Sequence, residues 1–348
     1  MMYVRPVADD DVDALIELFT DSGDRLNGMS SIRPEREFVA PRVARARKAW
    51  TDADPLPAEN DYFLVLVDGA TERVVGTSTI YSMIGLTEPF FSYRVGTQVA
   101  ASRELGVYRR TRTLYLSNDY TGVAEVASLF LHHDYIGSGN GRLISLARML
   151  FMAQHPDRFP DRVMAEMRGY QADDGSSPFW EGLGRHFFTL PFPEADRLSA
   201  TGNKVFIAEL MPRHPIYVPL LPDAAKEAIG QVHPNTEPAR RLLESEGFRW
   251  QGYVDIFDGG ASLDARIGDL RAVHESELEV VTEGIDLPED DPLLIATTGV
   301  ESFRCVVLPR YRIDAGRLEI DADTMRTLGV RGGDTVRVTP LRPGRSVL

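Results

Sequence analysis

The sequence is short of cysteine, of long apolar runs and of clustered positive charge, and each shortage removes a class of protein. A single cysteine, Cys305, cannot form an internal disulfide or a cysteine-based zinc site. No run of 18 apolar residues and no secretory signal is present, so we expect a cytoplasmic protein without a membrane segment. The formal net charge of −14 argues against a nucleic-acid partner, because phosphate contacts need grouped Lys and Arg.

Two types of reactive site are also disfavoured. Cys305 lies in the strand-like run 303–308, which favours a buried bystander over a nucleophile. The histidines and carboxylates show no convincing metal spacing, so we expect no metal.

The most informative stretch is 124–154, AEVASLFLHHDYIGSGNGRLISLARMLFMAQ. It predicts a buried strand over 126–131, a glycine turn over 137–142, and a helix with apolar residues at helical spacing. Gly137, Gly139 and Gly141 allow a ligand close to the backbone, and the helix start offers unpaired N–H groups. With Asn140 and Arg142, this turn is a candidate phosphate site, although a ligand-free reversal of the chain explains the glycines too.

Two common phosphate motifs do not fit the turn. A P-loop ends in Gly-Lys-Ser/Thr, whereas Gly141 is followed by Arg142. A dinucleotide fingerprint requires a third glycine where Arg142 stands. The pattern that remains is G-x-G-x-G between a strand and a helix.

The rest of the chain alternates strand and helix signals. The patterns predict strands over 2–7, 62–68, 73–81, 162–169, 204–210 and 249–257, helices over 9–19, 38–50, 178–188, 223–229 and 236–247, and an extended insertion over 85–122. Pro41 is expected in the first turn of its helix, and Ser177 and Thr236 are expected as helix caps.

The C-terminal part changes character at about residue 261. Short strand-like runs alternate with polar turns, and one short helix is expected over 322–328. We therefore expect a domain over 1–260 and a small β-barrel-like module over 261–348.

The order strand, helices, strands, glycine turn, helix, strand resembles the GNAT superfamily of acyl-CoA-dependent N-acyltransferases. Its pyrophosphate turn, Gln/Arg-x-x-Gly-x-Gly/Ala, is matched at 139–141, with Ile136 in place of Gln or Arg. A later helix ending in Leu-x-x-x-Gly-Phe resembles 243–248, and 178–188 is a second candidate for that helix. The resemblance implies an α+β fold with a mixed central sheet flanked by helices.

A longer set of segments is similar to the arginine N-succinyltransferase family: FFSYRVG, LYLSNDYTG, AEMRG, SPFWEGLGRHFF, GQVHPNTEPAR and EGFRWQGYVDIFDGG. This resemblance implies succinyl-CoA as donor, the α-amine of L-arginine as acceptor, and N-succinylarginine and CoA as products. It also implies that His233 is a proton donor and that Leu129 contacts succinyl-CoA.

Amide formation from a thioester needs a neutral amine, donors for the oxyanion and a proton for the thiolate. If strand 126–131 splays from its neighbour, the backbone of Leu129, Phe130 and Leu131 can pair with the pantetheine arm and supply N–H donors. His233 lies in a loop and can handle a proton near neutral pH, or it only stabilises the turn before Pro234. His132 and His133 are rival bases, or exposed residues at a strand end.

Arginine as a substrate calls for carboxylates that meet its guanidinium. Glu166 and Glu209, both expected within strands, are candidates, although Glu166 can instead pair with Arg168. Asp255 and Asp258 are further candidates. For the succinyl carboxylate we consider Arg94, Ser117 and Asn118.

Several alternatives remain open. The acceptor can be ornithine or another basic amino acid, or the chain can be a non-catalytic subunit that binds acyl-CoA. A homo-oligomer and a hetero-oligomer with a homologous chain are both compatible with the sequence. The polar segment 25–31 is either a plain loop or part of a substrate lid.

Overall fold

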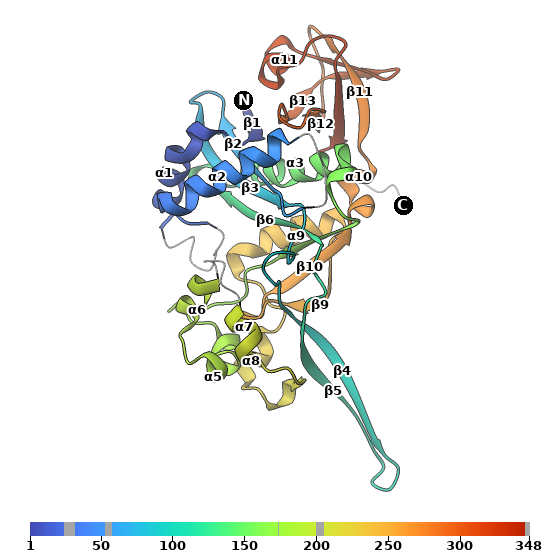
Figure 1. Ribbon diagram of the computed structural model, residues 1–348. Coiled ribbons are helices and arrows are strands. Elements are labelled where there is room, and N and C mark those ends of the chain that lie inside the picture. The colour runs from blue at the N-terminus through green and yellow to red at the C-terminus, as the bar shows by residue number, and fades with distance from the viewer. Residues whose placement is uncertain (24–31, 53–57, 173, 200–204, 345–348) are drawn as a thin grey trace.

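The computed structural model describes residues 1–23, 32–52, 58–172, 174–199 and 205–344 (Figure 1). In these residues one mixed sheet of 16 strands runs the length of the molecule. Its pairs are antiparallel except β6–β7 and β11–β15. In sheet order the strands are β14 (Arg312–Asp314), β15 (Arg317–Ile320), β11 (Glu277–Glu283), β16 (Thr335–Pro340), β12 (Glu289–Thr297), β13 (Cys305–Arg310), β1 (Met2–Pro6), β2 (Asp61–Asp68), β3 (Arg73–Tyr81), β6 (Ala124–Leu131), β7 (Arg162–Glu166), β10 (Ala261–Arg266), β9 (Arg249–Val254), β4 (Ser92–Ser102), β5 (Val107–Ser117) and β8 (Ile216–Tyr217).

Helices cover the sheet, so the predicted α+β architecture is confirmed. They are α1 (Val12–Ser22), α2 (Arg36–Thr51), α3 (Asn140–Gln154), α4 (Pro178–Gly182), α5 (Arg185–Phe188), α6 (Phe192–Ser199), α7 (Val205–Leu210), α8 (Asp223–Ala228), α9 (Glu237–Glu246), α10 (Arg271–His274) and α11 (Ala322–Leu328). Within the described ranges, no helix has both the length and the apolarity needed to cross a membrane.

Strand β2 shows how the central sheet is buried on both faces. Tyr62, Leu64 and Leu66 pack in the cluster that contains the apolar side chains of α3. The alternate residues Phe63, Val65 and Val67 pack with α1 and α2. Because successive strand residues point to opposite faces, a continuous apolar run here signals a strand covered on both sides.

The C-terminal strands do not close into a barrel. Strand β13 pairs with β12 on one edge and with β1 on the other, at Tyr3↔Val306 and Val4↔Cys305. The pairing with β1 continues the central sheet into this part of the chain, so the described sheet keeps two ends and the expected β-barrel-like module is not confirmed. Cys305 is buried in β13, and burial raises the pKa of its thiol.

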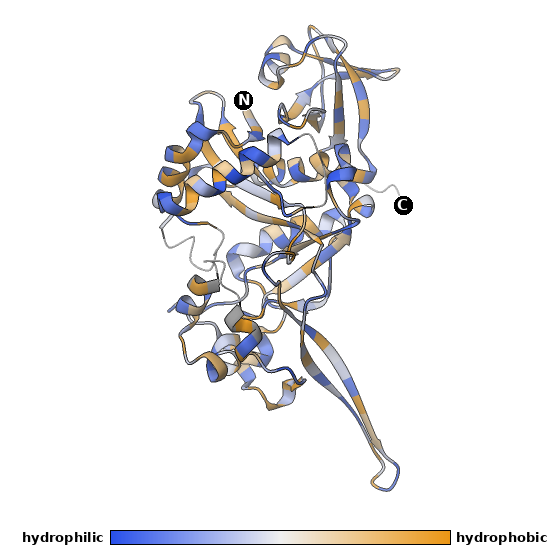
Figure 2. Ribbon diagram, viewed as in Figure 1, coloured by the Kyte–Doolittle hydropathy of each residue, from blue (hydrophilic) through white to orange (hydrophobic). Residues whose placement is uncertain are grey.

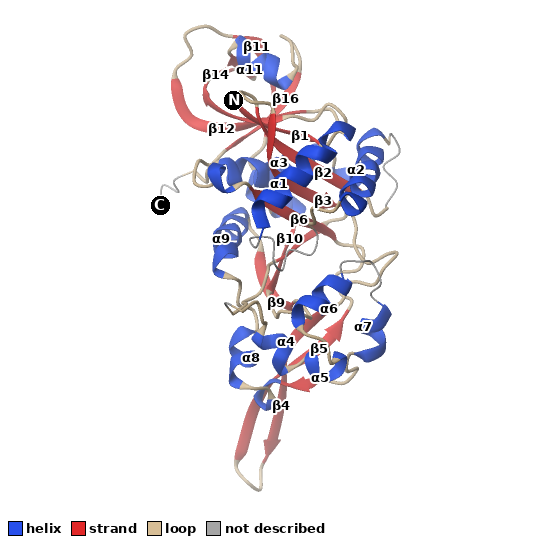
Figure 3. Ribbon diagram, turned by 90° about the vertical axis from the view of Figure 1, so that its left-hand side faces the viewer, coloured by secondary structure: helices blue, strands red, loops and turns tan. Residues whose placement is uncertain are grey.

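The extended insertion forms a long hairpin, β4 and β5, which projects from the body of the molecule (Figure 1). At its base, Tyr93 and Leu114 join a core with the helices α4 to α8. These helices lie beside β9 and the base of the hairpin in a second view (Figure 3). The buried apolar side chains Tyr93 and Leu114 thus belong to the base of the insertion, whereas its tip extends into solvent.

Four local predictions are wrong. Residues 205–210 form helix α7 and not a strand, and 178–188 is divided into α4 and α5. Helix α2 starts at Arg36, which puts Pro41 beyond the first turn. Ser177 caps α4 as predicted, but the side chain of Thr236 makes no cap for α9; His233 caps the 3-10 turn just before it.

Candidate functional site

An opening lies between the neighbouring strands β6 and β7. Their parallel pairing consists of Ala124↔Val163 and Glu125↔Met164, and the register ends there. On its other edge β6 stays paired with β3 as far as Gly76↔Leu131. The edge of β6 beyond Glu125 is therefore not paired with β7, which is compatible with the predicted separation of these strands.

A β-bulge at Ser128 marks the middle of the opening. Ser128 has a left-handed φ of 51°, and the register with β3 shifts between Thr77 and Thr79. Before the bulge Val126 packs on the α3 side, and after it Leu129 packs there too. The bulge thus reverses the alternation and sends Phe130 to the α1 side.

A buried polar network holds the bulge. Arg42 of α2 donates to the Ser128 hydroxyl at 3.0 Å and to Thr79 at 3.1 Å, and it lies 3.2 Å from Asp61. Thr79 in turn donates to Asp61 at 2.7 Å. Asp61 is almost fully buried, and Arg42 is the nearer of the two arginines that pair with it, Arg45 lying at 3.6 Å.

The glycine turn leads into the first turn of helix α3. Gly137 and Gly139 have φ of 85° and 86°, which L residues with a side chain rarely adopt. Asn140 is buried and ties the turn together by donating to Ser138 at 2.6 Å and to the Tyr135 carbonyl at 3.3 Å. Ile136 points its side chain into solvent, at 54% exposure.

Gly141 has no left-handed φ, and a Cβ added there would meet nothing within 4 Å. Neither backbone strain nor protein packing therefore requires a glycine at this position. Arg142 differs, because its guanidinium lies 3.7 Å from Glu246 and donates to the Leu341 carbonyl at 3.4 Å. The backbone N–H of Arg142 also donates to the Gly139 carbonyl. Both the side chain and the backbone N–H are therefore already bonded, which does not favour Arg142 as a phosphate ligand.

His233 is fixed against the continuation of β7. Its backbone N–H donates to the Arg168 carbonyl at 2.8 Å, and its ring Nδ1 accepts the backbone N–H of Asn235 at 3.1 Å. Burial and the nearby charge of Arg168 lower the pKa of His233, which favours the neutral ring. With Nδ1 as acceptor, the proton of the neutral ring is on Nε2, and that N–H is a potential donor.

Glu166, at the end of β7, belongs to a row of paired residues across the sheet. Glu166 pairs with Ser262, Ser262 with Tyr253, and Tyr253 with Arg94. Directly paired residues lie on one face, and three strand spacings place Arg94 about 14 Å from Glu166. The two side chains therefore do not contact the same small group.

The other predicted substrate residues are scattered. Ser117 accepts the N–H of Asp119, and Asn118 donates to the Phe90 carbonyl, at the start of the hairpin near Arg94. Glu209 is exposed on helix α7, so its predicted place in a strand is wrong. The lid candidate 25–31 lies outside the described residues.

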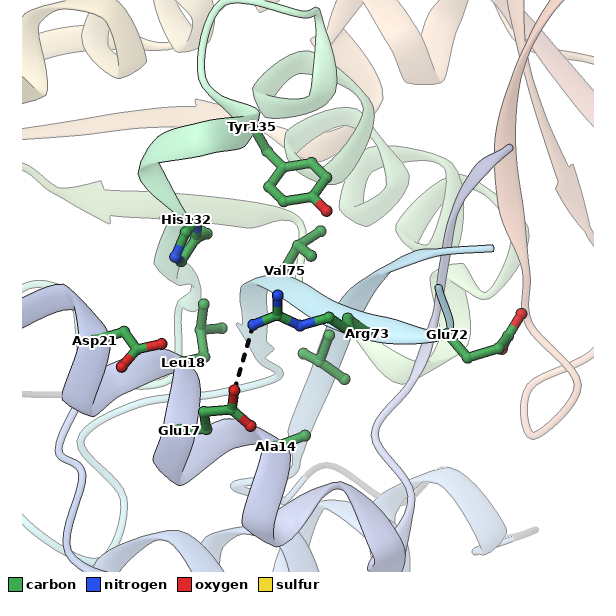
Figure 4. Close-up of a pocket in the computed structure, with 10 residues that line it drawn as sticks. Ala14, Glu17, Leu18, Asp21, Glu72, Arg73, Val75, His132 and Tyr135 are labelled. Atoms are coloured by element: carbon green, nitrogen blue, oxygen red, sulfur yellow. Dashed lines mark hydrogen bonds and ion pairs between the residues drawn. The ribbon is translucent and has the colours of Figure 1, made fainter. Parts of the chain in front are cut away.

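His132 lines a different feature, a small cavity of about 150 Å³ between α1 and β3. Figure 4 shows His132 and Tyr135 on one side of it and the ion pair of Glu17 and Arg73 on the other. This cavity is too small for an acyl-CoA. His132, His133 and Asp134 have ligand atoms within 4.8 Å of one another, but the three groups already bond among themselves.

A polar cluster that the sequence patterns did not bring together lies beside His233. Gln171 is 7% exposed and accepts a hydrogen bond from Arg168 at 2.7 Å. Asp196 of α6 and Asp255 after β9 act electrostatically on each other. Helix α6 has only eight residues, and an isolated glutamine has no motif, so only the folded chain shows this group.

Comparison with known proteins places the chain in a family. A family model described as the arginine N-succinyltransferase beta subunit matches residues 2–272, and the model of its C-terminal domain matches 276–340. The chain is 44% identical to an arginine N-succinyltransferase of Yersinia pseudotuberculosis (strain YPIII), over 98% of each chain. It is 45% identical to one of Escherichia coli (strain 55989), again over 98% of each.

A solved structure is similar over the full length. The arginine/ornithine succinyltransferase subunit AI of Pseudomonas aeruginosa superposes with a TM-score of 0.88, at 34% identity, and 99% of each chain is covered. Sequence and structure agree, and the chain belongs to the arginine N-succinyltransferase family.

Proposed function

We propose that this protein transfers the succinyl group of succinyl-CoA to the α-amine of L-arginine, giving N2-succinyl-L-arginine and CoA by direct transfer. The observation that carries the proposal is the opening between β6 and β7, flanked by the glycine turn and by His233. The relatives named above as arginine N-succinyltransferases support the choice of donor and acceptor.

The donor lies along the open edge of β6. Its pantetheine arm pairs with the backbone of Leu129, Phe130 and Leu131 like an added strand, because β7 has diverged from that edge. Its pyrophosphate binds the turn from Gly137 to Gly141 at the start of α3, where the helix dipole favours an anion. The vacant space above Gly141 supports this close approach.

The acceptor amine attacks the thioester carbonyl from the side of β7. Backbone N–H groups of β6 near Leu129 stabilise the developing oxyanion. The neutral His233 donates its Nε2–H to the departing thiolate while Nδ1 accepts the N–H of Asn235, and the proton that the attacking amine loses restores the ring, so that CoA leaves as a thiol. Glu166 lines this side of the opening and faces the acceptor.

The succinyl carboxylate of the donor is assigned to residues at the base of the hairpin. Arg94, Ser117 and Asn118 remain its predicted partners, and they lie together at the base of the hairpin. Four strand spacings separate β4 from β6, about 19 Å, so this assignment requires the donor to cross the sheet.

The exposed residues and the charge of the hairpin arm, residues 96–112, are evidence that this protein forms an oligomer in solution. Leu105 and Tyr108 are 78% and 67% exposed on it, and Figure 2 shows hydrophobic residues alternating with hydrophilic ones along the arm. A two-stranded ribbon is marginally stable in water by itself. The arm carries four arginines and one glutamate in a chain of net charge −14, so its charge complements the acidic surface of a second copy or of a homologous chain.

The proposed reaction is tested by acceptor competition. Purified protein receives succinyl-CoA with equal amounts of arginine and ornithine, and the products are resolved by mass spectrometry. Succinylation mainly of arginine, with release of one CoA thiol for each product formed, supports the proposal. Succinylated ornithine alone would assign the ornithine alternative, and no product at all would leave the non-catalytic subunit.

A further inference from the structure

A set of unpaired polar groups lies where β7 continues past its last paired residue. Gln171 is more than nine-tenths buried, and its Nε2 has no hydrogen-bond partner among the described residues. The Nε of Arg168 is buried and likewise unpaired within the described part of the chain. The two side chains are joined, since an Arg168 terminal nitrogen donates to Gln171 Oε1 at 2.7 Å. Two buried N–H donors thus lie together without an acceptor, an arrangement that is unfavourable in a free protein.

Two carboxylates, those of Asp255 and Asp196, lie in the same region as these donors. Asp255 accepts the N–H groups of Phe257 and Asp258 through one oxygen, Oδ1, at 2.7 Å each. Asp196 reaches the same region from α6, and the described residues give neither Asp196 nor Asp255 an ion pair within 4 Å. The negative charges of the two acids repel each other. The charge of Asp255 adds to burial in raising the pKa of Asp196. The charges of Arg33 and Arg168 offset only part of this repulsion, and a cationic ligand between the two acids relieves more of it.

The backbone places Arg168, Gln171 and Asp255 near His233, and Asp196 is close enough to Arg168 and Asp255 for their charges to act on it. The Arg168 carbonyl holds the N–H of His233, and Gly169 pairs with Val232. The N–H of Gly169 donates to Asp258 at 2.6 Å, which ties the loop containing Asp255 to the same stretch. The two donors and the loop of Asp255 are therefore joined to the proposed proton donor by backbone contacts.

We propose that Arg168 and Gln171 bind the α-carboxylate of the arginine acceptor and that Asp196 and Asp255 bind its guanidinium. This assignment rests on the proposed function for the identity of the ligand. An α-carboxylate on Arg168 and Gln171 holds the adjacent α-amine beside His233, where it is needed for attack. The guanidinium, with donors on both edges, then satisfies two carboxylates at once.

The assignment makes different predictions for the two ends of the ligand. Agmatine is arginine without its carboxylate, and norvaline lacks its guanidinium, so each probes one half of the site as a competitive inhibitor. Asp196→Asn removes one charge and keeps the shape of the side chain. Gln171→Met removes the amide and keeps its length. Asp255→Asn preserves the Oδ1 acceptor of the Phe257 and Asp258 N–H groups, and it repeats the test of the guanidinium end.

The experiment measures KM for arginine, KM for succinyl-CoA and the inhibition constants of the two probes. Asp196→Asn and Asp255→Asn should raise KM for arginine about tenfold or more and weaken agmatine in parallel, with norvaline unchanged. Gln171→Met should weaken arginine and norvaline and leave agmatine unchanged. KM for succinyl-CoA should stay the same in all three. The matched control is Glu194→Gln, an exposed acid two residues from Asp196 on the same helix, which should behave as the wild type.

Two failures are distinguishable. If the wild type succinylates arginine and Asp196→Asn leaves both arginine and agmatine unchanged, the assigned site is wrong and the proposed function survives. If the wild type does not succinylate arginine, the proposed function fails. Calorimetric titration of arginine into the wild type and Asp196→Asn, in the presence of CoA, then decides the site independently: tenfold weaker binding supports it, and equal binding overturns it.

Discussion

Asp196 is a carboxyl group whose charged form is unfavourable in the free protein. Burial and the neighbouring Asp255 raise its pKa to about 6, while Arg33 and Arg168 oppose the shift. A carboxyl whose pKa is higher in the folded protein than in the unfolded chain binds more protons when folded, so stability falls as the pH rises from about 4 through 6. Above that range the charged carboxylate destabilises the fold.

We therefore expect Asp196→Asn to be more stable than the wild type at neutral pH. The free energy of unfolding should rise by about 1 to 3 kcal/mol at pH 7, and the gain should shrink as the pH is lowered through 6. Urea unfolding at several pH values between about 5 and 8 measures the difference. A gain that is the same at every pH would show that repulsion between Asp196 and Asp255 is not its source.

Single residues were predictable where a motif names them. The family resemblance named His233, whereas its place in the loop alone left open that it only stabilises the turn before Pro234; its tautomer then followed from the Asn235 N–H. Asp196 and Gln171 were not predictable, because their role depends on which buried groups find no partner, and partners far apart in sequence decide that.

At the scale of elements, the β6 bulge depends on a helix on the opposite side of the strand. Arg42 links α2 to Ser128 in β6 and to Asp61 in β2, so three elements meet at one guanidinium. Sequence patterns predict all three elements but not the contact between them. A bulge with a left-handed φ is usually recognised by a glycine, and here the residue is a serine.

Removing that guanidinium should be costly. Arg42→Met leaves the buried Asp61 with Thr79 and the more distant Arg45, at 3.6 Å. We expect the free energy of unfolding to fall by about 3 kcal/mol, measured by urea unfolding. The control is Arg36→Met on the same helix, whose ion pair with Asp13 is exposed and should contribute less than about 1 kcal/mol. Equal losses in the two variants would contradict the network.

The glycine turn makes a prediction in which stability and binding separate. Gly141→Ala fills open space at a helical position, so it should leave the free energy of unfolding unchanged or raise it by up to about 1 kcal/mol. The same methyl group should block the pyrophosphate and weaken CoA binding at least tenfold, as measured by calorimetry. Gly332→Ala, which also meets nothing within 4 Å, is the matched control. Undiminished CoA binding by Gly141→Ala would place the pyrophosphate elsewhere.

Element types were predicted well where both faces of a strand are buried, and less well where the chain is covered on one side. Residues 205–210 have the β-like sequence VFIAEL, yet they form α7 and join a helical core with α4 and α8. The barrel was expected because short strands of similar length suggest closure. The partner that prevents closure, β1, lies about 300 residues earlier in the chain.

At the scale of the whole molecule, one sheet joins the C-terminal strands, the opening and the hairpin arm. The expected boundary at residue 260 would fall just before β10, which pairs with both β7 and β9 in the central part of that sheet. The division into 1–260 and 261–348 stays a prediction, and a fragment ending at 260 would lack a central strand.

The arm prediction belongs to this scale. Replacing residues 97–112 by a two-residue turn removes the exposed Leu105 and Tyr108 and the four arginines, while the base of the hairpin stays in its core. We expect the shortened chain to sediment as a smaller species than the full chain, with an unchanged circular dichroism spectrum in the near ultraviolet. An unchanged sedimentation coefficient, after correction for the removed mass, would show that the arm is not an interface.

The account as a whole depends on donor and acceptor meeting beside His233. The most direct test compares the wild type with His233→Ala at saturating succinyl-CoA and arginine, together with the Kd of CoA for each. We predict a fall in kcat of about 100-fold or more, with the Kd of CoA changed less than about threefold, because His233 donates a proton and does not hold the pyrophosphate. An unchanged kcat would contradict the role of His233.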